Sequence, residues 1–364
     1  MTTTNDRPEL RKAVQEFVDA GFLGVQLRVH DEHGAWTGVA GVSERGGTTP
    51  PPDGGLFRVG SVTKAFVATV VLRLVAEGRL GLDDPAAGHL PGFELDPRIT
   101  VRMLLQHTSG VFNHTGEYYE DGTVVPGIPW SGQEWVENRF VTYRPEDLVR
   151  LALAKPARFA PGTDWSYSNT NYVLARLLIE SVTGATFADE LRRLVLAPLG
   201  MTHTHAPGTD TDIPGPHAHA YYRYQDAAGQ EHVVDVSRQN PSWISAGGDM
   251  ISTTADLRTF VSALMGGRLL PAPLLAEMRS PHPKAGYGLG LFAQDTPNGT
   301  IYHHNGGNAG SAALMYSTPD GATTLTASLT YVDDAAMSLA RQFQESLARL
   351  VGEVFGGGAG PAGS

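Results

Sequence analysis

The strongest constraint on the fold is the placement of strand-like and helix-like patterns along the chain. Apolar and small residues alternate with polar ones in residues 22–34 and 35–47, which are joined by a polar turn containing glycine. The same period of two returns after residue 286, whereas apolar residues between these ends recur at helical spacing. The pattern predicts an α/β (α+β) fold, in which one antiparallel sheet from both ends of the chain is flanked by helices and interrupted by an all-helical insertion.

The same pattern predicts two lobes. Residues 1–82 and 283–355 are expected to form a discontinuous α/β lobe, and residues 83–282 a mainly helical lobe. The glycine-rich residues 356–364 are expected to be a flexible tail. The late strands and the helix that follows them are expected in residues 286–294, 299–306, 312–321, 323–332 and 335–355.

The beginning of the chain is amphipathic rather than continuously apolar. Leu10, Val14, Phe17 and Val18 share one face of a predicted helix, and no apolar run resembles a secretory leader. No run of 18 apolar residues indicates a membrane span. If the numbering starts at the native methionine, these features predict a cytoplasmic protein.

Composition excludes several functions. A chain of 364 residues with 41% hydrophobic residues can build a large core, and its net charge of −11, without a basic cluster, argues against nucleic-acid binding. Cysteine is absent, which excludes disulfides, thiolate metal sites and a cysteine nucleophile. The histidines form no recognisable ligand pattern, so we expect neither a metal nor another cofactor. The expected partner is a small-molecule or peptide substrate, and the oligomeric state stays open.

The segment "FRVGSVTKAF" contains Ser61 and Lys64, one of only four lysines in the chain. Residues three apart on a helix share a face, so the lysine can activate the serine hydroxyl if burial lowers its pKa. Arginine could not do this, because its guanidinium does not deprotonate in proteins. Chance occurrence of a serine and a lysine at this spacing is the alternative explanation.

Two further segments carry polar groups next to regular structure. Tyr167, Ser168 and Asn169 precede an apolar helix, where they could face a cleft or could simply cap the helix. His304, Asn305 and Gly306 lie on a predicted strand that could bind a substrate backbone, although an ordinary turn would also explain them.

Taken in order, these three segments resemble the S-x-x-K, S-D-N and K-T-G signatures of the penicillin-recognising serine enzymes. The Tyr-x-Asn form is similar to that of class C β-lactamases and D-alanyl-D-alanine carboxypeptidases. The segments "RITVRMLLQHTSG", "PGTDWSYSNTNYV" and "SAGGDMISTTADL" resemble the soluble Streptomyces-type carboxypeptidases. The resemblance covers residues 20–345 and implies a β-lactamase/transpeptidase-like fold.

The resemblance also implies roles for the residues. Ser61 would be the nucleophile, Lys64 and Tyr167 would move its proton, and His304 would supply polar or positive character near Tyr167. The backbone amides of Ser61 and Gly307 would form the oxyanion hole. Substrate-binding residues would be Asn169, Trp243, Phe292, Asn305, Gly306 and Gly307.

The chain departs from this family at two positions. Asn305 replaces the usual threonine or serine, and Phe292 stands where related carboxypeptidases carry an arginine for the substrate carboxylate. An esterase, an amidase or peptidase for blocked or D-configured substrates, or a biosynthetic transacylase or peptide cyclase fits these changes better than a strict carboxypeptidase or β-lactamase. A non-catalytic binding protein of the same fold is the alternative from another class.

Two other polar segments are assigned structural roles. Residues 113–116 contain a literal His-Thr-Gly, but they precede Tyr167 and are expected to be a surface or cleft-rim loop. His107 is expected to hold a loop through hydrogen bonds rather than to act as a base.

Overall fold

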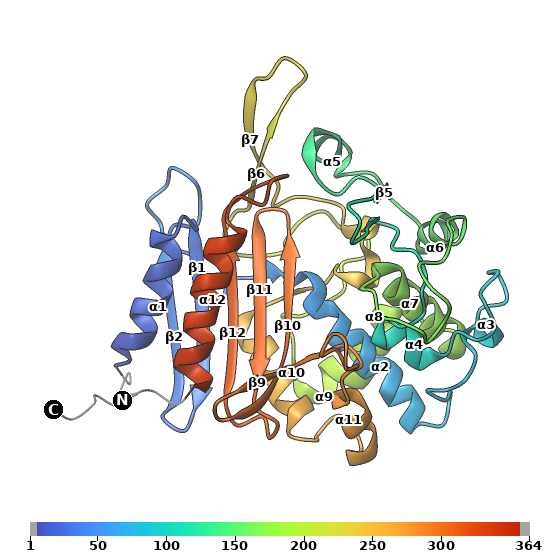
Figure 1. Cartoon of the computed structure of the whole chain (residues 1–364). Helices are drawn as coiled ribbons and strands as arrows, with labels where there is room; N and C mark the ends of the chain where they lie inside the picture. The colour runs from blue at the N-terminus through green and yellow to red at the C-terminus, as the bar shows by residue number, and fades with distance from the viewer. Residues whose placement is uncertain (1–5, 357–364) are drawn as a thin grey trace.

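The computed structural model describes residues 6–356, so most of the tail expected at 356–364 lies outside the described residues. The largest sheet has six strands in the order β2-β1-β12-β11-β10-β9, and each neighbouring pair is antiparallel (Figure 1). Its strands are β1 (Gly24–Asp31), β2 (Gly34–Gly41), β9 (Phe292–Thr296), β10 (Gly299–Asn308), β11 (Ser311–Ser317) and β12 (Thr324–Thr330). Because β1 pairs with β12, the expected sheet from both ends of the chain is confirmed.

Helices cover both faces of this sheet. The helices α1 (Pro8–Asp19) and α12 (Ala340–Phe355) lie together on one face, where Leu314 and Tyr316 of β11 join their apolar core (Figure 1). Ala313 and Met315 point to the other face and join a second, larger core with the central helices. Strand β11 is buried along its whole length for this reason.

The amphipathic helix expected near the start of the chain is present. Leu10, Val14 and Phe17 are buried against the sheet, and Val18 packs at the edge of the same core. The helix predicted from residue 335 begins only at Ala340.

A tight turn explains that late start. The carboxylate of Asp334 accepts hydrogen bonds from the backbone N–H and the hydroxyl of Ser338, and Met337 adopts a left-handed φ of 50°. These bonds compete with the first helical turn, so residues 335–339 leave strand β13 (Val332–Asp334) as a loop.

The central part of the chain supplies most of the helices. Helices are observed where the central apolar residues recur at helical spacing, and within residues 187–199 a π-helical turn (Arg192–Leu196) separates two short helices. The helices are α2 (Thr63–Ala76), α3 (Ala86–His89), α4 (Val101–Gln106), α5 (Gly132–Asn138), α6 (Pro145–Leu153), α7 (Asn169–Thr183), α8 (Phe187–Leu191), α9 (Ala197–Leu199), α10 (Thr254–Met265) and α11 (Ala272–Arg279).

The expectation of an all-helical insertion is wrong in detail, because the central segment also contains strands. The hairpin of β6 (Tyr221–Gln225) and β7 (Glu231–Asp235) contains three tyrosines and two valines, which favour strands, and β6 also pairs in parallel with β13. A second hairpin joins β4 (Gly116–Tyr118) to β5 (Val124–Pro126). A short ladder joins β3 (Phe57–Arg58) to β8 (Ile251–Ser252).

Among residues 6–356, no helix has both the length and the apolar character that crossing a bilayer requires.

Candidate active site

Ser61 lies at the junction between a strand and a buried helix. It is the middle residue of a single 3-10 turn, Gly60–Val62, between β3 and α2, and it is partly accessible. Lys64 follows in the first turn of α2, and its Nζ lies 3.0 Å from Ser61 Oγ. The contact expected from their spacing is therefore present.

Two oxygens from other elements contact the side-chain nitrogen of Lys64. Its Nζ lies 2.8 Å from Asn169 Oδ1 and 2.6 Å from the carbonyl oxygen of Gly247. Both oxygens can only accept hydrogen bonds, and a neutral amine has two N–H groups and one lone pair. When the two N–H groups bind these oxygens, the lone pair is left for the hydroxyl hydrogen of Ser61.

Burial favours this neutral form of Lys64. The side chain is fully buried, and burial alone lowers its pKa well below the ordinary value. The rings of Tyr167 and Tyr172 lie 4.6 and 5.6 Å from Nζ and form part of the enclosing wall. The site thus contains a serine in hydrogen-bond contact with a buried amine.

Tyr167, like Lys64, contacts Ser61. Its hydroxyl interacts with the Ser61 side chain, while burial raises the pKa of the phenol well above its ordinary value. A protonated phenol can accept a proton on its oxygen while it donates its own, so Tyr167 can relay a proton but does not serve as a standing phenolate.

Asn169 is held by two residues that lie more than 50 positions earlier in the sequence. Its backbone N–H donates to Asn113 Oδ1 at 3.0 Å, and its Nδ2 donates to Thr115 Oγ1 at 3.3 Å. Its side-chain oxygen is consequently turned toward Lys64. The role expected for Asn169, orienting a substrate amide, remains a proposal beside this observed contact.

Of the two places expected for segment 113–116, the surface is wrong, whereas the edge of the cleft agrees with the contacts of Asn113 and Thr115 to Asn169. His114 is fully buried, with Nε2 3.0 Å from the Trp243 carbonyl oxygen and Nδ1 3.1 Å from Thr170 Oγ1. The literal His-Thr-Gly supplies support for Asn169 through Thr115 and does not reach Ser61. Buried hydrogen-bonding partners from later segments explain why it lies inside the molecule.

His107 has the structural role that was predicted. It ends α4 in a left-handed conformation with φ of 63°, and its Nδ1 accepts a hydrogen bond from the backbone N–H of Ser168 at 3.2 Å. This bond anchors the loop that carries Tyr167.

His304 lies near Tyr167, with ring centroids 6.5 Å apart, but it does not bring positive charge. Burial, with a smaller contribution from Lys64, lowers the pKa of His304 to about 3. Its Nδ1 donates to the Asn305 carbonyl oxygen at 2.7 Å, which leaves Nε2 to accept from the Tyr287 hydroxyl at 3.2 Å. Of the expected polar or positive character, the low pKa of His304 opposes the positive alternative, while its hydrogen bond to Tyr287 agrees with the polar one.

The side chains of Asn305 and Phe292 are not brought to Ser61 as substrate anchors. Successive residues of a strand face opposite sides, and Asn305 Nδ2 donates to the Tyr316 hydroxyl on the α12 side of the sheet, at 2.8 Å. Phe292 packs edge-to-face on Tyr287, with centroids 4.6 Å apart. Substrate contact through Phe292 is therefore unsupported, whereas Asn305 also lines the pocket beside Gly306 and stays a proposed substrate contact.

Two glycines bring β10 against the nucleophile. A Cβ atom on Gly306 would collide with the Val59 carbonyl and would lie 2.9 Å from the Ser61 amide nitrogen. A Cβ atom on Gly60, whose φ is 52°, would lie 2.7 Å from the Gly307 amide nitrogen. The absence of side chains thus allows the backbone of β10 and the Ser61 turn to lie together, as the predicted oxyanion hole requires.

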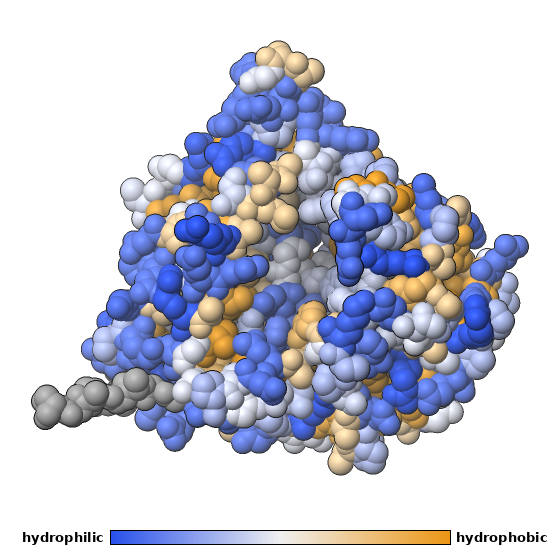
Figure 2. All heavy atoms as spheres, in the orientation of Figure 1, coloured by the Kyte–Doolittle hydropathy of each residue, from blue (hydrophilic) through white to orange (hydrophobic). Residues whose placement is uncertain are grey.

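A pocket adjoins this strand. It has a volume of about 400 Å³, and Trp243, Gly306 and Gly307 contribute to its wall. Figure 2 shows a hollow near the centre of the drawn face, beside the ends of β10 and β11. The predicted Trp243 is therefore placed at a cavity beside Gly306 and Gly307 of β10, whose lining does not include Ser61 or Lys64.

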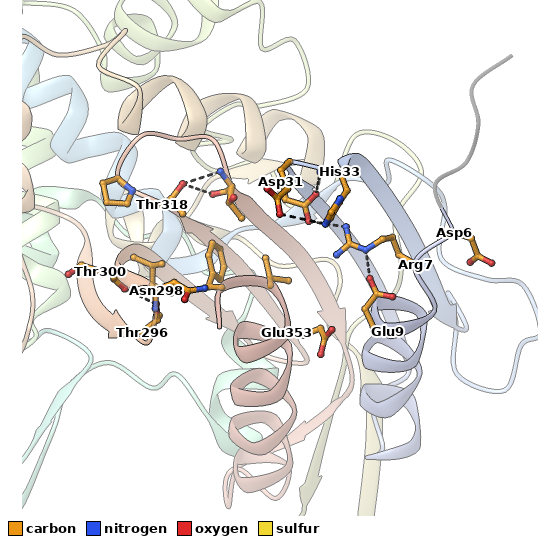
Figure 3. A pocket seen from close by; sticks show the side chains of 17 residues that line it. Asp6, Arg7, Glu9, Asp31, His33, Thr296, Asn298, Thr300, Thr318 and Glu353 are labelled. Atoms are coloured by element: carbon orange, nitrogen blue, oxygen red, sulfur yellow. Dashed lines mark hydrogen bonds and ion pairs between the residues drawn. The ribbon is translucent and has the colours of Figure 1, made fainter. Parts of the chain in front are cut away.

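A second hollow lies at the other end of the sheet. Figure 3 shows its polar lining, in which Arg7 bonds to Glu9 and Asp31. None of the three motifs contributes to it. The three motifs therefore lie away from this hollow, in the region where Lys64 of α2 contacts Ser61 and Asn169.

The sequence motifs correctly predicted that Ser61, Lys64, Tyr167 and Asn169 lie together. They did not predict the residues that hold these side chains in place. The Gly247 carbonyl lies in "SAGGDM", part of a segment quoted above for its resemblance, and Tyr287 lies in residues 286–294, which were expected to be a strand. Nothing in the pattern of residues 113–116 indicated that Thr115 binds Asn169.

Comparison with known proteins places these features in a family. The family model described as Beta-lactamase matches residues 10–344. Penicillin-binding protein 4* of Bacillus subtilis (strain 168) is 27% identical over 78% of this chain and 63% of its own length. Esterase EstB of Burkholderia gladioli is 38% identical over 44% of this chain and 41% of its own length. The chain thus spans less than two thirds of these curated relatives.

Solved structures give longer matches. A D-stereospecific amidohydrolase from Streptomyces sp. is 36% identical with a TM-score of 0.81, and the match covers 97% of this chain and 100% of the other. A D-amino acid amidase from Ochrobactrum anthropi SV3, complexed with L-phenylalanine amide, is 26% identical with a TM-score of 0.77 and covers 94% and 96%.

Proposed function

The chain belongs to the beta-lactamase family and is a serine hydrolase, and from this premise we propose that it cleaves an amide or ester bond through an acyl-enzyme on Ser61. The observation that carries the proposal is the environment of Lys64. Two obligate acceptors, Asn169 Oδ1 and the Gly247 carbonyl, take its N–H groups, and its nitrogen lies 3.0 Å from Ser61 Oγ. This arrangement suits a base that removes the serine proton at neutral pH.

The proposed reaction has two balanced steps. Ser61 Oγ forms a bond to the substrate carbonyl carbon while its proton passes to Lys64 Nζ. The bond to the leaving amine or alcohol then breaks, and the leaving group takes that proton from Lys64, directly or through Tyr167. Water repeats the sequence on the acyl-enzyme, returning the proton to Ser61 and releasing the acid.

Charge develops on the carbonyl oxygen in both steps. We place this oxygen between the backbone amides of Ser61 and Gly307, which Gly60 and Gly306 allow to lie together. A single donor of this kind accelerates acyl transfer by roughly 100- to 1000-fold.

We propose a neutral carboxamide or an ester as the substrate, rather than a peptide with a free C-terminal carboxylate. Phe292 replaces the expected arginine, and burial keeps His304 uncharged, so neither supplies a cation for a carboxylate. Burying a carboxylate without such a partner is costly. D-configuration is proposed because the structural relatives include a D-stereospecific amidohydrolase and a D-amino acid amidase.

Mass spectrometry of the intact protein tests the nucleophile. The protein is treated separately with a fluorophosphonate, an activated ester and a fluorescent penicillin, and Ser61→Ala is the matched control. We expect adducts with the first two reagents at Ser61 and a slower or absent reaction with penicillin. Equal labelling of Ser61→Ala, or no adduct with any reagent, would contradict the assignment.

Hydrolysis of amino acid amides tests the substrate class. Release of ammonia from D- and L-phenylalanine amide is compared with release of D-alanine from a peptide ending in D-alanyl-D-alanine. Faster hydrolysis of the D-amide supports the proposal, whereas faster release of D-alanine would favour a carboxypeptidase.

A further inference from the structure

Aromatic side chains form much of the wall of the pocket beside Gly306 and Gly307. Its lining comes from the loop before α5, from α5 itself, β6, the end of β10 and the segment between β13 and α12. The aromatic residues in the lining are Phe22, Trp130, Trp135, Tyr222, Trp243, Tyr331 and Phe343. Indole and phenol faces attract cations as well as apolar groups.

Charge in this pocket is entirely negative. Asp333 and Asp334 are its charged lining residues, and no lysine, arginine or histidine joins them. Asp334 is compensated, since its carboxylate lies 2.8 Å from Arg223 Nη2 and also binds Ser338. The net charge of the wall therefore resides on Asp333.

Asp333 is held at the pocket wall without a cation of its own. Strand β13 pairs with β6 so that Asp333 lies opposite Tyr222. Its carboxylate accepts only backbone bonds, from Gly310 at 3.4 Å and from Asp334 at 2.9 Å. Among residues 6–356 it forms no ion pair, and burial raises its pKa. A partly buried carboxylate of this kind is stabilised when a cation binds to it.

The distance from the catalytic strand limits which part of a substrate reaches Asp333. Its partner Gly310 lies three residues beyond Gly307, a span of at most about 10 Å of extended chain. An ammonium directly on the carbon next to the scissile carbonyl would stay beside Ser61, which is not among the residues that line the pocket. A lysine-like side chain, or the free amino terminus of a peptidyl acyl group, has a suitable length.

We propose that this pocket binds a primary ammonium carried by the acyl part of the substrate, within about 10 Å of the scissile carbonyl, with Asp333 as its counter-ion. The proposal rests on the function proposed for Ser61 and names the substrate class of that site. The apolar stem that bears the ammonium packs between the indoles of Trp130 and Trp243. Anionic acyl groups are excluded by the same carboxylate.

Paired substrates test this proposal. Diglycyl-D-phenylalanine p-nitroanilide is compared with its N-acetyl form, and the p-nitroanilide of Nα-acetyl-D-lysine with that of Nα-acetyl-D-norleucine. We expect kcat/KM to favour the cationic member by about 10- to 100-fold in at least one pair. The pair with the larger ratio identifies a peptide amino terminus or a side chain as the source of the ammonium.

Asp333→Asn should reduce that ratio to near one, while Glu353→Gln, which removes the same charge at the far end of α12, should keep it (Figure 3). A ratio that Asp333→Asn leaves unchanged, with an unchanged melting temperature, would overturn the proposal. A ratio near one in the unmodified protein would do so as well.

Binding to a Ser61→Ala protein separates this proposal from the proposed chemistry. Calorimetry with the diglycyl and lysyl substrates should show tighter binding than with their uncharged partners, and Asp333→Asn should abolish the difference. If the fluorophosphonate fails to label Ser61 but this difference persists, the function fails and the pocket assignment stands. If the fluorophosphonate labels Ser61 but the difference in binding is absent, the pocket assignment fails and the proposed function stands.

Discussion

Replacement of Asn169 by aspartate tests whether Lys64 works as a neutral base. The change keeps the size of the side chain but places a carboxylate oxygen 2.8 Å from Lys64 Nζ. At an effective dielectric constant of about 20, two unit charges at this distance attract by about 6 kcal/mol. This corresponds to roughly four pKa units. The pair should therefore hold one additional proton at neutral pH, opposing the effect of burial on the Lys64 pKa.

Either group can carry that proton with the same consequence for catalysis. In both cases the lone pair of Lys64 is no longer open to Ser61, so acylation should fall by at least about 100-fold at neutral pH. Raising the pH should restore part of the rate. The assay is the single-turnover rate of fluorophosphonate labelling between about pH 5 and pH 10.

Asn113→Asp is the matched control. It adds the same charge to the residue that binds the Asn169 backbone N–H, without direct contact to Lys64 Nζ. We expect a smaller shift of the pH profile in the same direction. An Asn169→Asp protein that folds normally and keeps both the rate and the pH profile of the unmodified protein would refute the neutral-base mechanism.

Three further outcomes are expected. Tyr167→Phe should slow the departure of poor leaving groups on the order of 10²- to 10⁴-fold and affect activated esters less; a leaving-group series measured by stopped flow checks this, and a uniform loss would argue against a relay. Gly306→Ala should push β10 away from the Ser61 turn and lower kcat by about 100-fold, and a normal kcat with a chromogenic ester would contradict the oxyanion-hole assignment. Burial lowers the pKa of His114 to about 4 and of His304 to about 3, against about 6.5 in an unfolded chain. The unfolded chain therefore binds more protons, so the free energy of unfolding should fall as the pH drops from about 6.5 toward 4; urea titrations measure it, and His114→Gln should reduce the slope.

The contact between Ser61 and Lys64 could be predicted because its geometry is local. Ser61 and Lys64 are three residues apart at a helix start, and their contact needs little information from the rest of the chain. The order of the motifs then added Tyr167 and Asn169. The sheet could be predicted equally well, because alternation of apolar residues indicates which segments are strands and which face of each is buried.

Other parts of the site depend on contacts that no local pattern contains. The orientation of Asn305 follows from the face that β10 turns toward the helices, and its neighbours in "YHHNGG" do not alternate in polarity. The neutral state of His304 follows from burial among aromatic rings such as Tyr287. Thr115 supports Asn169 across 54 positions of sequence. Strands within the insertion were missed for the same reason, since β6 is completed by β13 from a distant segment.

The pairing of β1 with β12 also governs when the catalytic centre can assemble. Gly24 pairs with Thr330, so closing the sheet joins segments about 300 residues apart, at an entropic cost of about 5 kcal/mol from chain length alone. During synthesis the helix with the nucleophile is complete long before β10, which must lie against it, has left the ribosome. The nascent chain therefore carries its serine and lysine for most of translation without an oxyanion hole, and activity should appear abruptly, after the last sheet strands emerge.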